Sequence, residues 1–136
     1  MLKKEVARGA GGWIVIMDSI TRLVPGDTGA IVVSASHGGA SSAEYALEVP
    51  LRAAFFNDAG FGKDNAGAAA LALLQARGVA AGVVAHTSAR IGDAQDMWDH
   101  GVVSAVNERA AAMGAHGGVP LRDCLLAFVT NFKRPL

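Results

Sequence analysis

Short apolar runs alternate with helical patterns along most of the chain, and this alternation is the feature that most constrains its fold. Each run is bounded by glycine, proline or polar residues and contains β-branched or aromatic side chains, which is typical of strands. The fourth run is apolar at nearly every position, as expected for a strand with both faces covered. The predicted strands occupy residues 13–17, 29–36, 52–57 and 79–88.

Helical patterns fill the intervals after these runs. Pro50 ends the first pattern, because proline cannot continue a helix, and Gly78 supplies a left-handed cap for the second. In the third, Val102, Val106 and Met113 recur at helical spacing. The predicted helices cover residues 42–49, 65–77, 94–113 and 119–132, the last of them opened by Pro120.

The resulting order β, β, α, β, α, β, α, α predicts one three-layer α/β domain over residues 1–136, with a mostly parallel sheet and room for one antiparallel edge strand. Residues 1–11 carry no predicted element and form a candidate flexible N-terminus. Ile20 and Leu23 can extend the first strand towards the turn signal "PGDTG" at 25–29. That turn also allows the first two strands to pair as an antiparallel hairpin.

Composition and charge exclude several classes of protein. Twelve basic and twelve acidic residues balance, so no basic field is available to attract nucleic acid. The longest apolar runs are far shorter than the roughly 20 residues that cross a bilayer, and the N-terminal one is too short for a signal peptide. We therefore expect a cytoplasmic protein with no nucleic-acid or membrane partner. The single cysteine, Cys124, provides for no disulfide or cysteine-based metal site within one chain.

The densest polar and glycine content follows three successive predicted strands. These segments are the loops at 36–42, 57–65 and 87–96, whereas the connectors at the opposite ends of the strands are short and plain. In a parallel sheet the carboxyl ends of the strands lie at one edge, and ligands bind in the crevice outside them. The sequence therefore predicts a functional site formed by these three loops.

His37 and Asp58 are the candidate proton-transfer groups of this site. His37 ends a buried strand, and Gly38 and Gly39 after it let a ligand approach closely. Asp58 has no local capping role that would explain its position. A structural hydrogen bond is the alternative for His37. The other histidines, His86, His100 and His116, are interpreted as structural.

Lys63 and Arg90 are the candidate anion-binding groups. Lys63 follows Gly62 just before a predicted helix, which resembles the P-loop pattern G-x-x-x-x-G-K-[ST]. The pattern fails at Asn57 and at Asp64, so a nucleotide triphosphatase is not predicted. A glycine-rich turn with a lysine can still hold a carboxylate or a single phosphate. Arg90 offers a planar fork to the same anion.

Structural roles are the alternatives for several of these charges. Asp64 and Asp93 can each cap the helix that follows, and Arg90 can pair with Asp93 or Asp58 to fasten two loops. A divalent cation held by His37 and these three aspartates is a further alternative, although the nearby cations would repel it. So is a serine nucleophile beside His37 and Asp58, although no G-x-S-x-G elbow is present.

The leading hypothesis is a small hydrolase or lyase acting on an anionic metabolite, with a carboxylate favoured. The alternative is a non-catalytic domain that uses the same loops to bind a small anion or another chain. No cofactor is required, a divalent cation stays an option, and the high hydropathy predicts a homo-oligomer. The predicted catalytic residues are His37, Asp58 and Lys63, and the predicted substrate-binding residues are Gly38, Gly39, Gly62, Asp64, Ser88 and Arg90.

Overall fold

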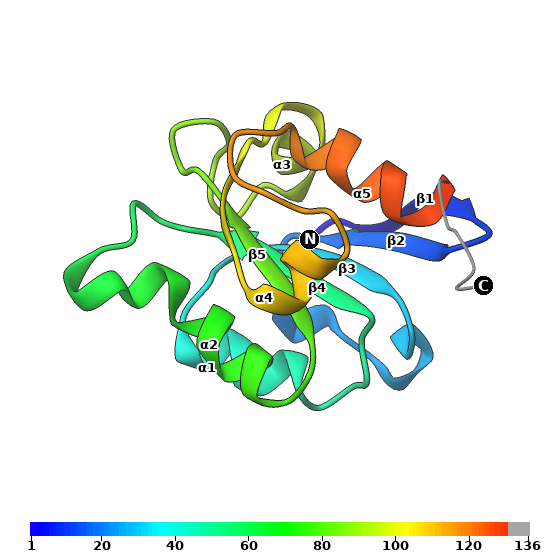
Figure 1. The fold of residues 1–136 in the computed structure, drawn as a ribbon, viewed down its shortest axis with the longest axis horizontal. Helices are drawn as coiled ribbons and strands as arrows, with labels where there is room; N and C mark the ends of the chain where they lie inside the picture. The colour runs from blue at the N-terminus through cyan, green and yellow to red at the C-terminus, as the bar shows by residue number, and fades with distance from the viewer. Residues whose placement is uncertain (131–136) are drawn as a thin grey trace.

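The protein is built on one six-stranded sheet in which the strands follow one another in sequence order (Figure 1). The computed structural model describes residues 1–130, apart from the side chains of Lys63 and Asp64 and the burial of Gly67. Strands β2 to β5 run parallel, and β1 and β6 pair antiparallel with the two ends of this block. The strands are β1 (Lys3–Gly9), β2 (Gly12–Met17), β3 (Ile31–His37), β4 (Ala53–Asn57), β5 (Ala80–Val84) and β6 (Val103–Val106).

Helices cover both faces of the sheet, which confirms the predicted three-layer α/β domain (Figure 1). One layer contains α1 and α2, and the other contains α3 and α5, with α4 beside the end of β5. Within the part of the chain that the structure describes, no helix is both long and apolar enough to span a bilayer. The helices are α1 (Ala40–Ala46), α2 (Ala69–Ala76), α3 (Ala94–His100), α4 (Glu108–Ala112) and α5 (Leu121–Thr130).

Two apolar cores form because successive strand residues point to opposite faces of the sheet. Phe55 packs into the core under α3 and α5, and its neighbour Phe56 packs into the core under α1 and α2. Both rings are fully buried, and each such burial stabilises the fold by about 1.5–3 kcal/mol. Gly82 lies against the Phe55 ring, where a Cβ atom would overlap the ring carbons. This contact explains a glycine in the middle of a central strand.

The hairpin proposed between the first two predicted strands is wrong. β2 and β3 pair in parallel, with Ile14 opposite Ile31, and the segment between them contains two short 3-10 helices instead of an extended strand end. The antiparallel partner of β2 is β1, formed by residues 3–9 in the segment for which the sequence suggested a flexible N-terminus. β1 escaped prediction because it is a charged, half-exposed edge strand. The 3-10 helices are η1 (Ile20–Arg22) and η2 (Pro25–Asp27).

The long helix predicted at 94–113 is also wrong, because the chain divides there into α3, β6 and α4. Gly101 has extended backbone angles and ends α3. β6 then pairs antiparallel with β5, with Ala105 opposite Val83. The valines that suggested a helical period are β-branched and occupy the strand and its approach. Asn107 begins α4, and its side-chain oxygen accepts hydrogen bonds from the backbone N–H groups of Ala110 and Ala81.

Smaller differences affect the ends of the predicted elements. β5 ends at Val84 and not at 88, so His86 lies in the turn beyond it. A 3-10 helix, η3 (Lys63–Ala68), precedes α2, whose N-cap residue Ala68 makes no side-chain capping hydrogen bond. The cap predicted for the Asp64 side chain lies outside the described residues. Gly78 has φ +75° at the end of α2, as predicted. The last two residues of the predicted helix 119–132 lie outside the described residues.

Candidate functional site

The three predicted loops lie side by side at the carboxyl ends of β3, β4 and β5. The Gly38 N–H donates to the Asn57 carbonyl at 2.8 Å, which joins the first loop to the second. The fully buried Asn57 side chain donates to the Ala89 carbonyl at 3.0 Å, which joins the second to the third. The Gly92 N–H donates a hydrogen bond to the Ala35 carbonyl near the end of β3 at 2.9 Å, which joins the third loop to the first strand of the group. These bonds fix the relative positions of the loops.

The chain leaves this edge towards opposite faces of the sheet, and this divergence opens a crevice. After β3 and β4 it enters α1 and α2 on one face, whereas after β5, the neighbour of β4, it crosses to α3 on the other face. Helix α3 contacts β2 and β3. Loops that leave neighbouring strands in opposite directions form the usual ligand-binding crevice of an α/β sheet. Two depressions occur here, one on each side of the segment 89–92.

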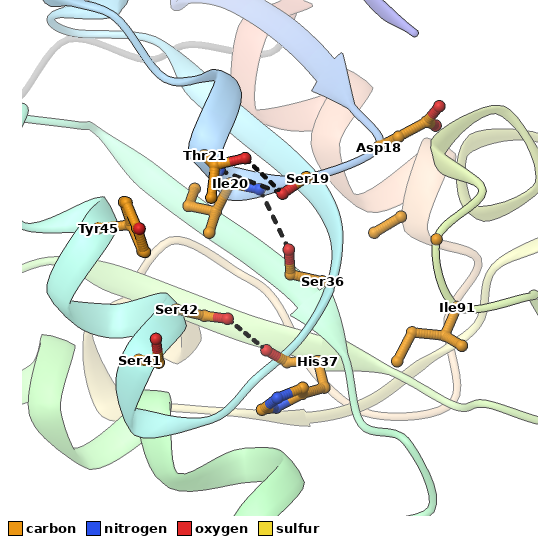
Figure 2. A pocket seen from close by; sticks show the side chains of 12 residues that line it. Asp18, Ser19, Ile20, Thr21, Ser36, His37, Ser41, Ser42, Tyr45 and Ile91 are labelled. Carbon is orange, nitrogen blue, oxygen red and sulfur yellow. Dashed lines mark hydrogen bonds between the residues drawn. The ribbon is translucent and has the colours of Figure 1, made fainter. Parts of the chain in front are cut away.

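The larger depression is a cleft of about 370 Å³ between η1, α1 and the β5–α3 loop (Figure 2). His37 lies on its border, exposed, with its carbonyl accepting a hydrogen bond from the Ser42 hydroxyl at 2.6 Å. The His37 ring packs over Gly39, where a Cβ atom would come 2.7 Å from Nδ1. A side chain at this position would therefore displace the ring. The cleft is lined by Asp18, Ser19, Ile20, Thr21, Ala35, Ser36, His37, Ser41, Ser42, Tyr45, Ile91 and Gly92.

Asp58 is buried away from that cleft, with only 2% of its surface exposed. Its carboxylate accepts hydrogen bonds from the Gly60 N–H at 2.7 Å, the His86 N–H at 3.1 Å and the Ser104 hydroxyl at 2.7 Å. Burial raises the pKa of Asp58, but the hydrogen bonds from Ser104, Gly60 and His86 outweigh it and hold this pKa below its ordinary value. Asp58 is therefore a buried, ionised carboxylate at neutral pH.

His86 is the histidine that lies beside Asp58. Its Nδ1 atom is 3.3 Å from the Asp58 Oδ1 atom, and 53% of its side chain is exposed. Gly60 packs against one face of the ring, where a Cβ atom would lie 3.3 Å from Cε1. The sequence pattern places His86 within the predicted strand 79–88 and so favours a structural role for it. The signal that could have identified it is the polar segment "HTS" directly after the apolar run that ends at Val84.

The turn directly after Asp58 has unusual backbone angles. Ala59, Gly60, Phe61 and Gly62 all have positive φ, with values between 51° and 76°. Glycine adopts this region freely, but it costs alanine and phenylalanine about 1–2 kcal/mol each. Such strain persists only where the surroundings fix the backbone, and it is enriched at functional sites.

The smaller depression, of about 260 Å³, lies next to His86 and is lined by His86, Thr87, Ser88, Ala89, Arg90 and Asp96. Arg90 is exposed, and its guanidinium makes no hydrogen bond or ion pair with any side chain that the structure describes. The proposed pairs with Asp93 and Asp58 do not form within these residues. Asp93 instead caps α3, as predicted, by accepting from the Asp96 N–H at 3.0 Å.

Asp96 and Ser88 are largely occupied by structural contacts. The Asp96 carboxylate accepts from the Arg90 N–H at 2.8 Å and lies 2.9 Å from His100 Nδ1, and these contacts hold its pKa below the ordinary value. The Ser88 hydroxyl donates to the Ala85 carbonyl at 2.7 Å and accepts from the Val102 N–H at 2.9 Å. The predicted role of Ser88 in binding a substrate would have to compete with these bonds.

The predicted site residues thus fall into two groups. His37 borders the cleft with Gly39 beneath its ring, whereas Asp58, Ser88 and Arg90 surround or approach His86. Gly38 is buried. Its N–H donates to the Asn57 carbonyl, and its carbonyl accepts a hydrogen bond from the Ala70 N–H at 2.9 Å. Gly62 is exposed at the start of η3. The side chains of Lys63 and Asp64 lie outside the described residues.

No protein-family model, curated protein or solved structure matches this chain. Its function must therefore be inferred from its own side chains. Among those described, no three histidine, cysteine, aspartate or glutamate residues gather closely enough to hold a metal ion. Nor does any described serine hydroxyl make a hydrogen bond to a histidine ring. General acid–base chemistry at His86 is what the arrangement supports best.

Proposed function

We propose that this protein is a small cytoplasmic enzyme of the hydrolase or lyase type that acts on an anionic metabolite, with a carboxylate favoured. The observation that carries the proposal is the buried, ionised Asp58 beside the exposed ring of His86. In this proposal His86 moves the proton, Asp58 positions His86, and Arg90 binds the anion. His86 takes the role that the sequence analysis gave to His37 and Asp58.

A buried carboxylate next to one ring nitrogen controls which nitrogen carries the proton. With Asp58 3.3 Å from Nδ1, the neutral ring favours the proton on Nδ1 and leaves Nε2 as an acceptor. A ring held in this way can remove a proton from water or from carbon and later return it. Asp58 itself is a positioning residue, because its oxygens already accept three hydrogen bonds.

Arg90 supplies the positive charge for the substrate. It shares the smaller depression with His86, and its planar fork suits a carboxylate or a phosphate. Lys63, which follows Gly62 in the neighbouring loop, remains the second proposed cation. A base beside a bound carboxylate can activate water for hydrolysis, or it can remove a proton from the adjacent carbon in an elimination.

A non-catalytic role is the second candidate, and the same contacts favour it in one respect. Hydrogen bonds from Gly60, His86 and Ser104 to Asp58 also fasten two loops together, as a structural carboxylate would. In that case the loops bind a small anion, or join subunits of the homo-oligomer that the sequence predicts, and nothing is turned over. Binding without turnover would favour this candidate.

Anion binding is tested first, by thermal shift of the purified protein with a panel of small carboxylates and phosphates. An anion at 100 times its dissociation constant raises stability by about 2.7 kcal/mol. Arg90→Gln should abolish the shift. Arg77→Gln is the matched control, because Arg77 is an exposed arginine at the end of α2, away from these loops. If no anion raises the unfolding midpoint of the native protein, or if both variants respond as the native protein does, the proposal of an anion site at Arg90 is wrong.

Catalysis is then tested with any anion that binds. His86→Gln should lose turnover and retain binding, whereas His37→Gln should retain both. Asp58→Asn should lower turnover, since the ring then loses the carboxylate that orients it. Equal turnover in the native protein and in His86→Gln would rule out the proposed catalytic role.

A further inference from the structure

The cleft between η1, α1 and the β5–α3 loop plays no part in the function proposed above, yet it has the features of a binding site (Figure 2). Its floor is the end of β3, and η1 and α1 form two of its walls. Ile91 and Gly92 close the remaining side. A volume of about 370 Å³ lies within the roughly 300–1,000 Å³ of small-molecule sites. It would hold one or two rings.

Hydroxyl groups are the main polar groups of this cleft. The Ser19 and Thr21 hydroxyls lie 2.8 Å apart, so they share one hydrogen bond and keep further donor and acceptor capacity. The Ser36 hydroxyl accepts from the Ile20 N–H at 3.1 Å and retains its own proton to donate. Tyr45 adds a phenolic hydroxyl from α1. These groups can both donate to and accept from a ligand that carries hydroxyls of its own.

Charge is largely absent from the cleft. Asp18 is its only carboxylate among the described residues, and its two oxygens accept from the Leu2 N–H at 2.8 Å and the Ala94 N–H at 2.9 Å. The Asp18 carboxylate points away from the centre of the cleft (Figure 2). No described lysine or arginine lines it. An anionic ligand would therefore lose hydration there without gaining a lysine or arginine as its counter-charge.

Two exposed apolar side chains flank the cleft from opposite sides (Figure 2). Tyr45 is 42% exposed and Ile91 is 49% exposed, which is unusual for large apolar residues of this protein. An aromatic ring and a branched aliphatic group on facing walls suit a flat or ring-shaped ligand, whose apolar faces would cover both. Most small-molecule sites combine such apolar walls with a few placed polar groups.

From these four features we propose that the cleft is a second binding site, for an uncharged ring compound that carries several hydroxyl groups. The hydroxyls of the ligand meet Ser19, Thr21 and Ser36, and its ring lies between Tyr45 and Ile91. Monosaccharides and nucleosides share this chemistry. The inference does not rest on the proposed activity at His86, because the two depressions share no lining residue.

Protein NMR with four probes tests the proposal: methyl α-D-glucopyranoside, adenosine, and the charged counterparts glucose 6-phosphate and adenosine monophosphate. At least one neutral probe should produce saturable shifts of the Ile91 methyl signals and of the amides of η1 at millimolar concentration, and its phosphate should bind no more tightly there. Binding of the sugar alone, or of adenosine alone, would identify the source of the ring.

A pair of variants locates the binding. Tyr45→Ala should raise the dissociation constant of the neutral probe at least fivefold, because one of the two apolar side chains that flank the cleft is removed. Leu73→Ala is the matched control, since Leu73 is also 42% exposed but lies outside the cleft, on α2. Both substitutions change exposed side chains, so the fold is preserved. The proposal is overturned if neither neutral probe shifts these signals, if the phosphates bind more tightly in the cleft, or if both variants weaken binding equally.

Discussion

The ends of β3 and β5 each place a histidine at the same edge of the sheet, but in different surroundings. His37 lies on the border of a hydroxyl-rich cleft that no described lysine or arginine lines, and its ring is exposed. The ring of His86 contacts a buried carboxylate and lies in a depression that also contains an arginine. Position at the edge of a sheet therefore does not define a catalytic histidine. The groups that contact the ring do.

The largest expected difference between the two regions is in stability. Asp58→Ala leaves the Ser104 hydroxyl and two backbone N–H groups without their acceptor, so it should cost about 3 kcal/mol of unfolding free energy. His37→Ala removes an exposed ring and should change this free energy by about 0.5 kcal/mol or less. Urea denaturation measures both values. Similar costs for the two variants would contradict the difference in surroundings between Asp58 and His37.

A second prediction concerns how the contribution of Asp58 depends on pH. The folded state holds the pKa of Asp58 below its ordinary value, so the stabilisation is complete above the unfolded pKa of about 3.9 and is lost as pH falls through the lower folded pKa. The stability difference between the native protein and Asp58→Asn should therefore shrink between about pH 5 and about pH 2. Urea midpoints across this range provide the measurement. A difference that stays constant with pH would contradict the ionised state of Asp58.

The glycines beside the two rings allow a smaller, matched comparison. Gly60→Ala must place alanine at φ +76°, so it should destabilise the protein by about 1–2 kcal/mol and move the His86 ring. Gly39 has an ordinary φ of −88°, so Gly39→Ala should act mainly by displacing the exposed His37 ring and should cost less. Denaturation and the ring signals of both histidines report the two effects. A larger loss of unfolding free energy in Gly39→Ala than in Gly60→Ala would contradict this expectation.

Sequence analysis predicted the parallel strands and the helices on both faces because their apolar periods are strong and local. It missed β1 and β6 because edge strands are stabilised mainly by pairing with a neighbour. In β6, Val103 and Val106 fit a helical period as well as a strand, and only the pairing with β5 decides between them. The predicted helix 94–113 runs through Gly101, whereas the structure ends α3 at this residue.

The position of the candidate site was more predictable than its chemistry. The three polar loops follow from the carboxyl-edge rule, and hydrogen bonds such as that from Asn57 to Ala89 join them. Which histidine lies beside Asp58 was not predictable, because it depends on where β5 ends and on the strained turn at 59–62. A strand that continued to residue 88 would place His86 inside an element, where a histidine is predicted to be structural, but β5 ends at Val84.

The most direct test of the central claim is nitrogen-15 NMR of the histidine rings near neutral pH. If Asp58 orients His86, the neutral His86 ring should carry its proton on Nδ1, His37 should show no such preference, and the Nδ1 preference of His86 should be lost in Asp58→Asn. A His86 ring protonated mainly on Nε2, with no change in Asp58→Asn, would contradict the proposed arrangement.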